Sequence, residues 1–276
     1  MHATIGDNVV TSSRILLRRR SEDLDYLAAC LHGRRSRMAE AERLDGLCRI
    51  RNLSEFLSAI YPETEVQGVT QFQRLLVSEL ADELYGFLSF LSGPGADLLN
   101  WMLVRFQVEN LKVLARQCFT RASTEEASKH LVPLPKELSL NIQGFAQAES
   151  LQDFIRLVPK GPFRESAERI ARVADDKTRM FFFEVALDRA YLEGLVARAG
   201  RLAREDNEVV RAIVCQEADM FHLMLVVRGK FHYRLSMEII QPLHVAGTMI
   251  SRGLFAAMLN DLELDTSVGR VSERVL

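Results

Sequence analysis

The chain contains only four cysteines in 276 residues, at positions 30, 48, 118 and 215. They form no C-x-x-C pair and have no other close spacing, which argues against a zinc knuckle, a thioredoxin-like motif and a secreted disulfide framework. The chain also lacks an apolar run of the roughly 18 to 20 residues that a membrane span needs. Its N-terminus lacks the apolar core of a signal peptide. We therefore expect a reduced intracellular protein with no membrane span of its own, so that any membrane association is through a partner.

An excess of either charge is also missing. The 35 Lys and Arg residues nearly balance the 37 Asp and Glu residues, for a formal net charge of −2. Binding of nucleic acid through a bulk electrostatic field is therefore not expected. The runs Arg18-Arg19-Arg20 and Arg34-Arg35-Ser36-Arg37 are local exceptions. We interpret them as solvated helix faces or a frayed N-terminus.

The motifs of enzymes are absent as well. His222, His232 and His244 are ten and twelve residues apart, which does not place two imidazoles on one helix turn as H-E-x-x-H does. Asp175-Asp176 would suit magnesium-dependent chemistry, but it lacks a second acidic cluster and fits the first turn of a helix. No G-x-S-x-G, P-loop or G-x-G-x-x-G pattern occurs. The sequence predicts no catalytic centre, no metal site and no cofactor.

What the chain does contain is helical periodicity along most of its length. Hydrophobic residues make up 48% of it, enough for a sizeable core. Apolar spacing and start and stop signals predict helices at about residues 21–46, 53–60, 70–92, 95–118, 151–157, 163–200 and 205–230. The segment Leu131-Val132-Pro133-Leu134-Pro135 cannot be helical, because its prolines fix φ and push their predecessors into extended conformations. We expect an all-α fold with a joint between modules at that segment.

Part of the sequence is repeated. Residues 105–116 are similar to residues 217–228, and in this alignment Asn110 matches His222 and Arg116 matches Arg228. Residues 52–57 similarly match residues 150–155. A period of about a hundred residues indicates stacked or pseudo-symmetric helical modules, which are usually built to hold a partner.

The repeated segments resemble a known family. Residues 183–191, Phe-Glu-Val-Ala-Leu-Asp-Arg-Ala-Tyr, resemble the E-x-x-L-D-R-x-Y helix of the C subunit of archaeal and bacterial V/A-type rotary ATPases, called the d subunit in eukaryotic vacuolar ATPases. Glu217-Ala218-Asp219, followed by Leu223 and Arg228-Gly229-Lys230, is similar to another segment of that family. The resemblance extends from about residue 24 to residue 260. Gln107 stands where the family often has an acidic residue, and His222 replaces its usual asparagine.

The resemblance implies a funnel of three similar all-helical lobes around a pseudo-threefold axis. On this basis we expect a first lobe at residues 21–130, a second at 131–235 and a partial third at 236–276. Residues 244–260 resemble the start of the third lobe, which would then be incomplete.

The family also implies a function and partners. Its members are non-catalytic parts of the central stalk, which couple the rotating shaft, made of the D and F subunits, to the membrane proteolipid ring for proton or sodium transport. The chain would then be cytoplasmic and peripheral to the membrane through the complex. Candidate residues for the shaft contact are Glu109, Arg116, Arg228 and Lys230.

Two alternatives stay open from the residues alone. The polar and charged repeat positions could be packing and ion-pairing residues within the modules rather than the lining of a socket for the shaft. The whole chain could also be a helical-repeat adaptor that binds another protein in a concave face.

Overall fold

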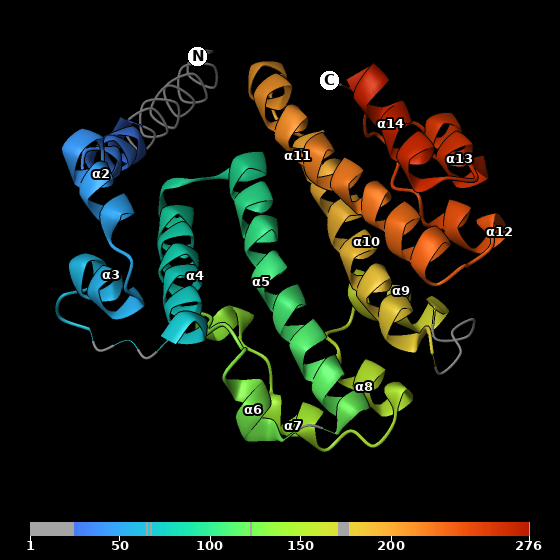
Figure 1. Ribbon diagram of the computed structural model, residues 1–276, viewed down its shortest axis with the longest axis horizontal. Coiled ribbons are helices and arrows are strands. Elements are labelled where there is room, and N and C mark those ends of the chain that lie inside the picture. The colour runs from blue at the N-terminus through green and yellow to red at the C-terminus, as the bar shows by residue number, and fades with distance from the viewer. Residues whose placement is uncertain (1–24, 65, 67, 122, 171–176, 276) are drawn as a thin grey trace, which may run out of the picture. The chain divides into compact units, whose positions relative to one another are not determined.

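The computed structural model describes residues 25–64, 66, 68–121, 123–170 and 177–275 (Figure 1). The described chain consists of helices and the turns between them, with no strand, which confirms the all-α class. None of the described helices is both long enough and apolar enough to cross a membrane. The Arg18-Arg19-Arg20 run and Asp175-Asp176 lie outside the described residues.

The chain divides into two compact units. The first unit comprises Met1–Leu103 with Val132–Glu137, and the second comprises Val104–Leu131 with Leu138–Leu276. Helix α5, Gly93–Thr120, contributes its first part to the first unit and its remainder to the second.

The first unit is built from short helices and one long one. Residues 25–35 are helical, and α2 (Ala41–Arg49), α3 (Leu53–Ile60), α4 (Gly68–Phe87) and the 3-10 helix η1 (Leu88–Phe90) follow. The prediction of one helix over residues 21–46 was wrong, because the chain leaves the helical conformation at residues 36–40. Helix α3 begins as predicted, since the Asn52 side chain accepts a hydrogen bond from the Ser54 N–H at 2.8 Å.

The second unit contains the longer run of elements. After α5 these are α6 (Thr124–Ser128), α7 (Ile142–Ala146), α8 (Leu151–Leu157), α9 (Pro162–Ile170), α10 (Arg179–Ala199), α11 (Arg204–Met224), the π-helix η3 (Leu225–His232), α12 (Met237–Ile240), the 3-10 helix η4 (Gln241–Leu243), α13 (Arg252–Asn260) and α14 (Leu264–Val275). A further 3-10 helix, η2 (Lys136–Leu138), lies at the boundary between the units. As predicted, residues 131–135 are not helical.

Two of the predicted long helices differ in the structure. The predicted helix 163–200 is two helices, because α9 ends at Ile170, residues 177–178 form a turn and α9 packs against α10. The predicted helix 205–230 is regular only to Met224 and continues as the π-helix η3. Apolar spacing does not distinguish these cases, since a second helix that packs on the first continues the same hydrophobic pattern.

Helix α10 forms the centre of the second unit, between α9 and α11 (Figure 1). Phe181, Phe182 and Phe183 follow one another on it, and all three are buried. Phe183 meets Phe154 of α8 at a ring distance of 5.4 Å, whereas Phe181 meets Tyr233 at 4.8 Å. Twelve residues of α10 are buried, so it is surrounded by other elements over most of its length and is the core helix of this unit.

The bounds of the helices reproduce the register of the sequence repeat. In the sequence repeat, Asn110 aligns with His222, which is 112 residues later. The end of α4 at Phe87 and the end of α10 at Ala199 are also 112 residues apart. Two hydrogen bonds follow the same register. The Gln107 side chain donates to the Leu138 carbonyl, 31 residues later, and the Asp219 carboxylate accepts from the Ile250 N–H, again 31 residues later.

Candidate partner-binding site

Four charged residues of α5 line the helix face that meets α10. Arg105, Glu109, Lys112 and Arg116 are spaced four, three and four residues apart, which places them on one side of a helix. They face Asp188 and Glu184, which lie one turn apart on α10. We call these six residues, together with Arg228, the charged seam. All of them belong to the second unit.

Glu184 is the centre of the seam. Its Oε1 accepts hydrogen bonds from Arg116 Nε at 2.9 Å and Nη2 at 2.5 Å. Its Oε2 accepts from Arg228 Nη1 at 3.2 Å and Nη2 at 3.3 Å. Only 6% of Glu184 is exposed to solvent. The two arginines that occupy equivalent positions in the repeat therefore bind opposite oxygens of one buried carboxylate, which satisfies its charge.

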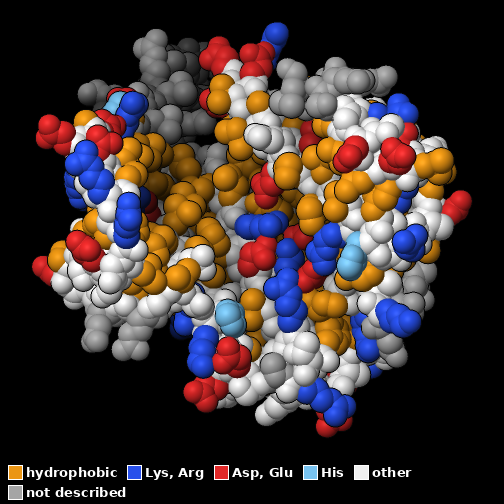
Figure 2. Space-filling view, in the orientation of Figure 1, with side chains coloured by type: hydrophobic (Ala, Val, Ile, Leu, Met, Phe, Trp, Pro, Cys, Tyr) orange, Lys and Arg blue, Asp and Glu red, His pale blue; other side chains and the backbone are white. Residues whose placement is uncertain are grey.

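The rest of the seam centres on Asp188. Lys112 Nζ lies 2.6 Å from Asp188 Oδ1, and Arg105 Nη1 lies 3.2 Å from the same oxygen. Burial raises the pKa of the Asp188 carboxyl, while Lys112 and then Arg105 oppose this rise. Glu109 pairs with the same two cations: its Oε1 lies 2.8 Å from Arg105 Nη2 and 3.1 Å from Lys112 Nζ. Oppositely charged side chains alternate across this interface between helices, as blue and red atoms in the middle of Figure 2 show.

Lys230 lies apart from the seam, although it is two residues from Arg228. Its Nζ donates to the Met258 carbonyl at 3.1 Å and also to the Asp261 carbonyl, at the C-terminal end of α13. Burial lowers the pKa of this ammonium group. A cation at the unpaired carbonyls of a helix end is favourable, so Lys230 caps α13.

Next to the seam is a pocket of about 520 Å³. Its lining residues are Glu109, Val113, Arg116, Gln117, Thr120, Glu126, Ala127 and His130. Two of the four predicted contact residues, Glu109 and Arg116, thus share a pocket wall. The side chain of Arg116 is 55% exposed despite its bonds to Glu184. The pocket carries both charges and presents no arrangement of nucleophile and base.

A second polar group holds the loop at residues 244–250 against α11. Asp219 accepts hydrogen bonds from the Ile250 N–H at 2.9 Å and the Met249 N–H at 3.2 Å. His222 Nε2 accepts from the Val245 N–H at 2.9 Å, and its ring stacks on that of His244 with centroids 4.5 Å apart. These two histidines, distant in sequence, are structural. No group of three or more His, Cys, Asp or Glu side chains able to hold a metal occurs in the part of the chain described.

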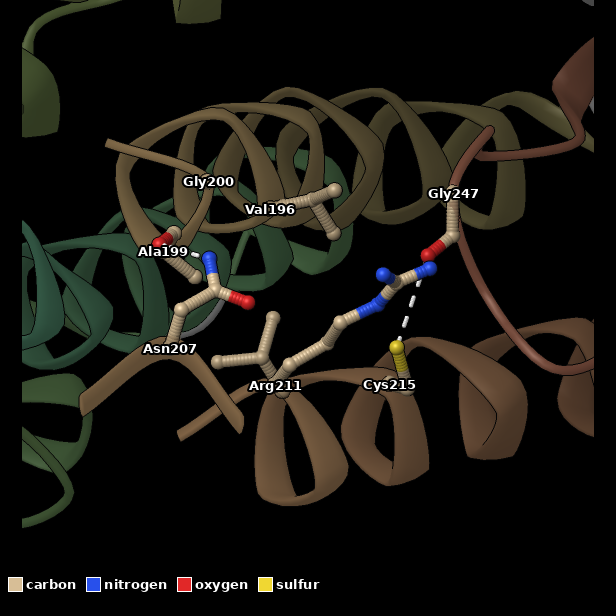
Figure 3. Close-up of a pocket in the computed structure, with 8 residues that line it drawn as sticks. Val196, Ala199, Gly200, Asn207, Arg211, Cys215 and Gly247 are labelled. Atoms are coloured by element: carbon tan, nitrogen blue, oxygen red, sulfur yellow. Dashed lines mark hydrogen bonds between the residues drawn. The ribbon is translucent and has the colours of Figure 1, made fainter. Parts of the chain in front are cut away.

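The same loop closes a smaller pocket of about 160 Å³ at the ends of α10 and α11 (Figure 3). Asn207 donates to the Ala199 carbonyl at 2.7 Å, and Arg211 extends across the pocket towards Gly247. Gly247 has a φ of +84°, and a Cβ there would lie 3.2 Å from Val196 Cγ1. Both observations require glycine at this close approach of the loop.

Sequence reasoning named four residues, and the structure places three of them, Glu109, Arg116 and Arg228, on the seam. The sequence did not indicate Glu184, which forms ion pairs with both Arg116 and Arg228, although Glu184 lies in the E-x-x-L-D-R-x-Y-like helix. An acidic residue within an apolar stretch of helix was the signal that could have identified it, because a buried charge requires partners.

Comparisons with known proteins agree with the resemblance. The chain is 24% identical to the C subunit of the A-type ATP synthase of Methanocaldococcus jannaschii over 190 residues, which is 68% of this chain and 47% of that protein. It is 23% identical to the protein of the same name from Methanothermobacter thermautotrophicus over 209 residues, 74% of this chain and 54% of the relative. The chain therefore spans about half the length of these relatives. No solved structure matches it.

The family model covers far more of the chain than any single motif. It describes the ATP synthase (C/AC39) subunit and matches residues 27–274, from the first described helix to the last turn of α14. Membership in a family of ATP synthase subunits agrees with the expectation of a structural subunit rather than a separate enzyme. The described residues form an all-α fold, and the chain belongs to the ATP synthase (C/AC39) subunit family.

Proposed function

We propose that this chain is a non-catalytic central-stalk subunit of a V/A-type rotary ATPase. In this role it couples the rotating shaft, formed by the D and F subunits, to the membrane proteolipid ring during proton or sodium transport. It lies in the cytoplasm and is peripheral to the membrane through the complex. Its lobes, at residues 21–130, 131–235 and 236–276, form a funnel around a pseudo-threefold axis.

The observation that supports a coupling role most directly is the charged seam. A part that passes torque must resist sliding between its helices. In the second unit, α5, α10 and η3 are joined by ion pairs that converge on the buried Glu184. Several charges that share partners in a network hold one geometry better than isolated surface pairs do.

We propose that the shaft contacts the wall of the pocket beside the seam. Glu109 and Arg116 have side chains that are 39% and 55% exposed, and that of Arg228 is 39% exposed. Each can therefore meet a partner while it keeps its internal bond. Lys230 has a smaller part in this proposal, because its ammonium group is occupied at the end of α13.

The test is reconstitution of the full chain with the purified shaft complex of the D and F subunits, with binding measured by size-exclusion chromatography and titration. We expect a stable complex, and we expect Glu109→Lys to weaken it by about tenfold, or roughly 1.4 kcal/mol. Arg204→Glu is the matched control, because the Arg204 side chain is 92% exposed and is not one of the residues that line the pocket. A wild-type chain that binds neither the shaft nor proteolipid-containing membranes would overturn the proposal and favour a helical-repeat adaptor.

A further inference from the structure

The outer face of α11 carries a row of exposed apolar side chains. Val209, Ile213, Met220 and Met224 have exposed fractions of 69%, 65%, 54% and 44%. We call these four residues the α11 stripe. Single exposed apolar residues are ordinary on a protein surface, but aligned groups of them mark sites of interaction.

The four residues are aligned by their spacing. They follow one another at intervals of four, seven and four residues, so at about 100° per residue they fall within an arc of roughly 60° on the helix. With a rise of about 1.5 Å per residue, the stripe is about 22 Å long. It has the width and length of the contact that one α-helix makes along another.

The opposite face of α11 supplies the internal packing. Its buried residues are Val214, Cys215, Ala218, Asp219, Phe221 and His222. They pack against α10 and hold the 244–250 loop. Because α11 already contributes this face to the core, the stripe is a second apolar face, which the fold of the unit does not require.

Within α11, the charged residues nearest the stripe are acidic. Glu205, Asp206 and Glu217 fall within about 80° of Val209 around the helix. Glu217 also pairs with Arg105 of α5 at 3.9 Å, so the unpaired acidic charge lies mainly near the start of α11. The arginines of α11, Arg204 and Arg211, lie about 140° and 160° from Val209, on the other side of the helix. Arg211 indeed extends into the small pocket near Gly247 (Figure 3).

We propose that the α11 stripe docks an amphipathic α-helix of a partner protein, with apolar side chains along one face and Lys or Arg on the flanks of that face. The apolar row supplies the contact area, and the acidic flanks select a basic partner. A second copy of this chain is a poor occupant, because a symmetric pairing of stripes would bring acidic flanks together. This inference does not rest on the proposed function, since it uses only the residues of α11.

The test uses the full chain and two labelled synthetic peptides of about 20 residues, the length of α11. Both carry leucines at the spacing of the stripe, one with flanking lysines and the other with flanking glutamates. Binding is measured by fluorescence anisotropy at low and high salt. We expect the lysine peptide to bind at least about tenfold more tightly, and the difference to shrink as salt screens the acidic flanks.

Matched variants localise the contact. Ile213→Asn and Met220→Gln should each weaken binding of the lysine peptide by about tenfold. Met249→Gln should leave it unchanged, because Met249 is 59% exposed but lies outside α11. Equal loss in all three variants, equal binding of the two peptides or no binding at all would overturn the proposal. So would a concentration-dependent dimer that Ile213→Asn dissociates, since it would assign the stripe to a second copy. None of these outcomes depends on binding of the shaft complex, so the two proposals can fail separately.

Discussion

At the scale of single residues, Glu184 explains why two arginines recur at equivalent positions of the repeat. A carboxylate that is 6% exposed loses most of its hydration, and Arg116 and Arg228 replace that hydration with charge-assisted hydrogen bonds. Both guanidinium groups remain partly in water, so each alone contributes less than the carboxylate that they share.

We expect Glu184→Gln to lower the free energy of unfolding by about 1 to 2 kcal/mol, because it leaves two guanidinium groups facing a neutral amide. Arg116→Gln should cost less, about 1 kcal/mol or under, since Arg228 still pairs with Glu184. Both values can be measured by urea unfolding followed by circular dichroism. Glu193→Gln is the control, since Glu193 belongs to an exposed pair with Arg189, and its effect should stay within about 0.5 kcal/mol. A cost for Glu184→Gln no larger than that of the control would contradict a structural role of the seam.

At the scale of elements, the stability of the 244–250 loop depends on the protonation states of the side chains that bind it. His244 is buried against His222, and its Nε2 donates to the Ile250 carbonyl at 2.8 Å. Burial lowers the pKa of His244, and the neighbouring His222 and Arg252 add to this effect, while the hydrogen bond to the Ile250 carbonyl and the charge of Asp219 oppose it. The folded chain therefore favours the neutral imidazole.

This direction of the pKa shift predicts that acidification loosens the loop. An unfolded histidine has a pKa of about 6.5, so the folded state loses stability as the pH falls below that value. We expect the urea midpoint to decrease from pH 7.5 to pH 5.5, and hydrogen exchange at residues 245–250 to accelerate. His244→Gln, which keeps a donor for the Ile250 carbonyl, should reduce the pH dependence. His130→Gln should not, because the His130 side chain is 53% exposed. The idea is wrong if the two variants respond to pH alike.

At the scale of the whole molecule, the two units differ in their cores. Among the described residues of the first unit, the buried apolar side chains are Leu57, Ala81, Leu98 and Leu103. The second unit buries many more, including the three consecutive phenylalanines of α10. Since buried apolar area is the main source of stability, the first unit should open more easily than the second.

The single tryptophan makes this difference measurable. Trp101 lies in the first unit, whereas circular dichroism follows the helices of both units. We expect the urea transition of Trp101 fluorescence to come at a lower concentration than the main transition in circular dichroism. Phe183→Leu, in the core of the second unit, should shift the later transition with little effect on the earlier one. Coincident transitions would instead mean that the chain unfolds as one cooperative block.

The sequence by itself determined the features that depend on local interactions. Apolar spacing identified most helices, and Pro133 and Pro135 identified a non-helical segment, because these signals act within a few residues of themselves. The start of α3, where the Asn52 side chain caps the helix, was predictable for the same reason. The repeated register and the family resemblance were also readable, since both are properties of residue order.

Only the tertiary structure decided which residues meet. Arg116 and Arg228 are 112 positions apart in the sequence. Both form ion pairs with Glu184 only because α5 and η3 pack around α10. Lys230 looked like part of the same motif as Arg228, but it binds the end of α13, because residues two apart on a helix point to different sides. The separation of α9 from α10 likewise follows from packing, since the hydrophobic pattern of one long helix and that of two packed helices are alike. Such contacts join segments that are far apart in the chain. A single sequence shows each residue of a contact but not which other residue it meets.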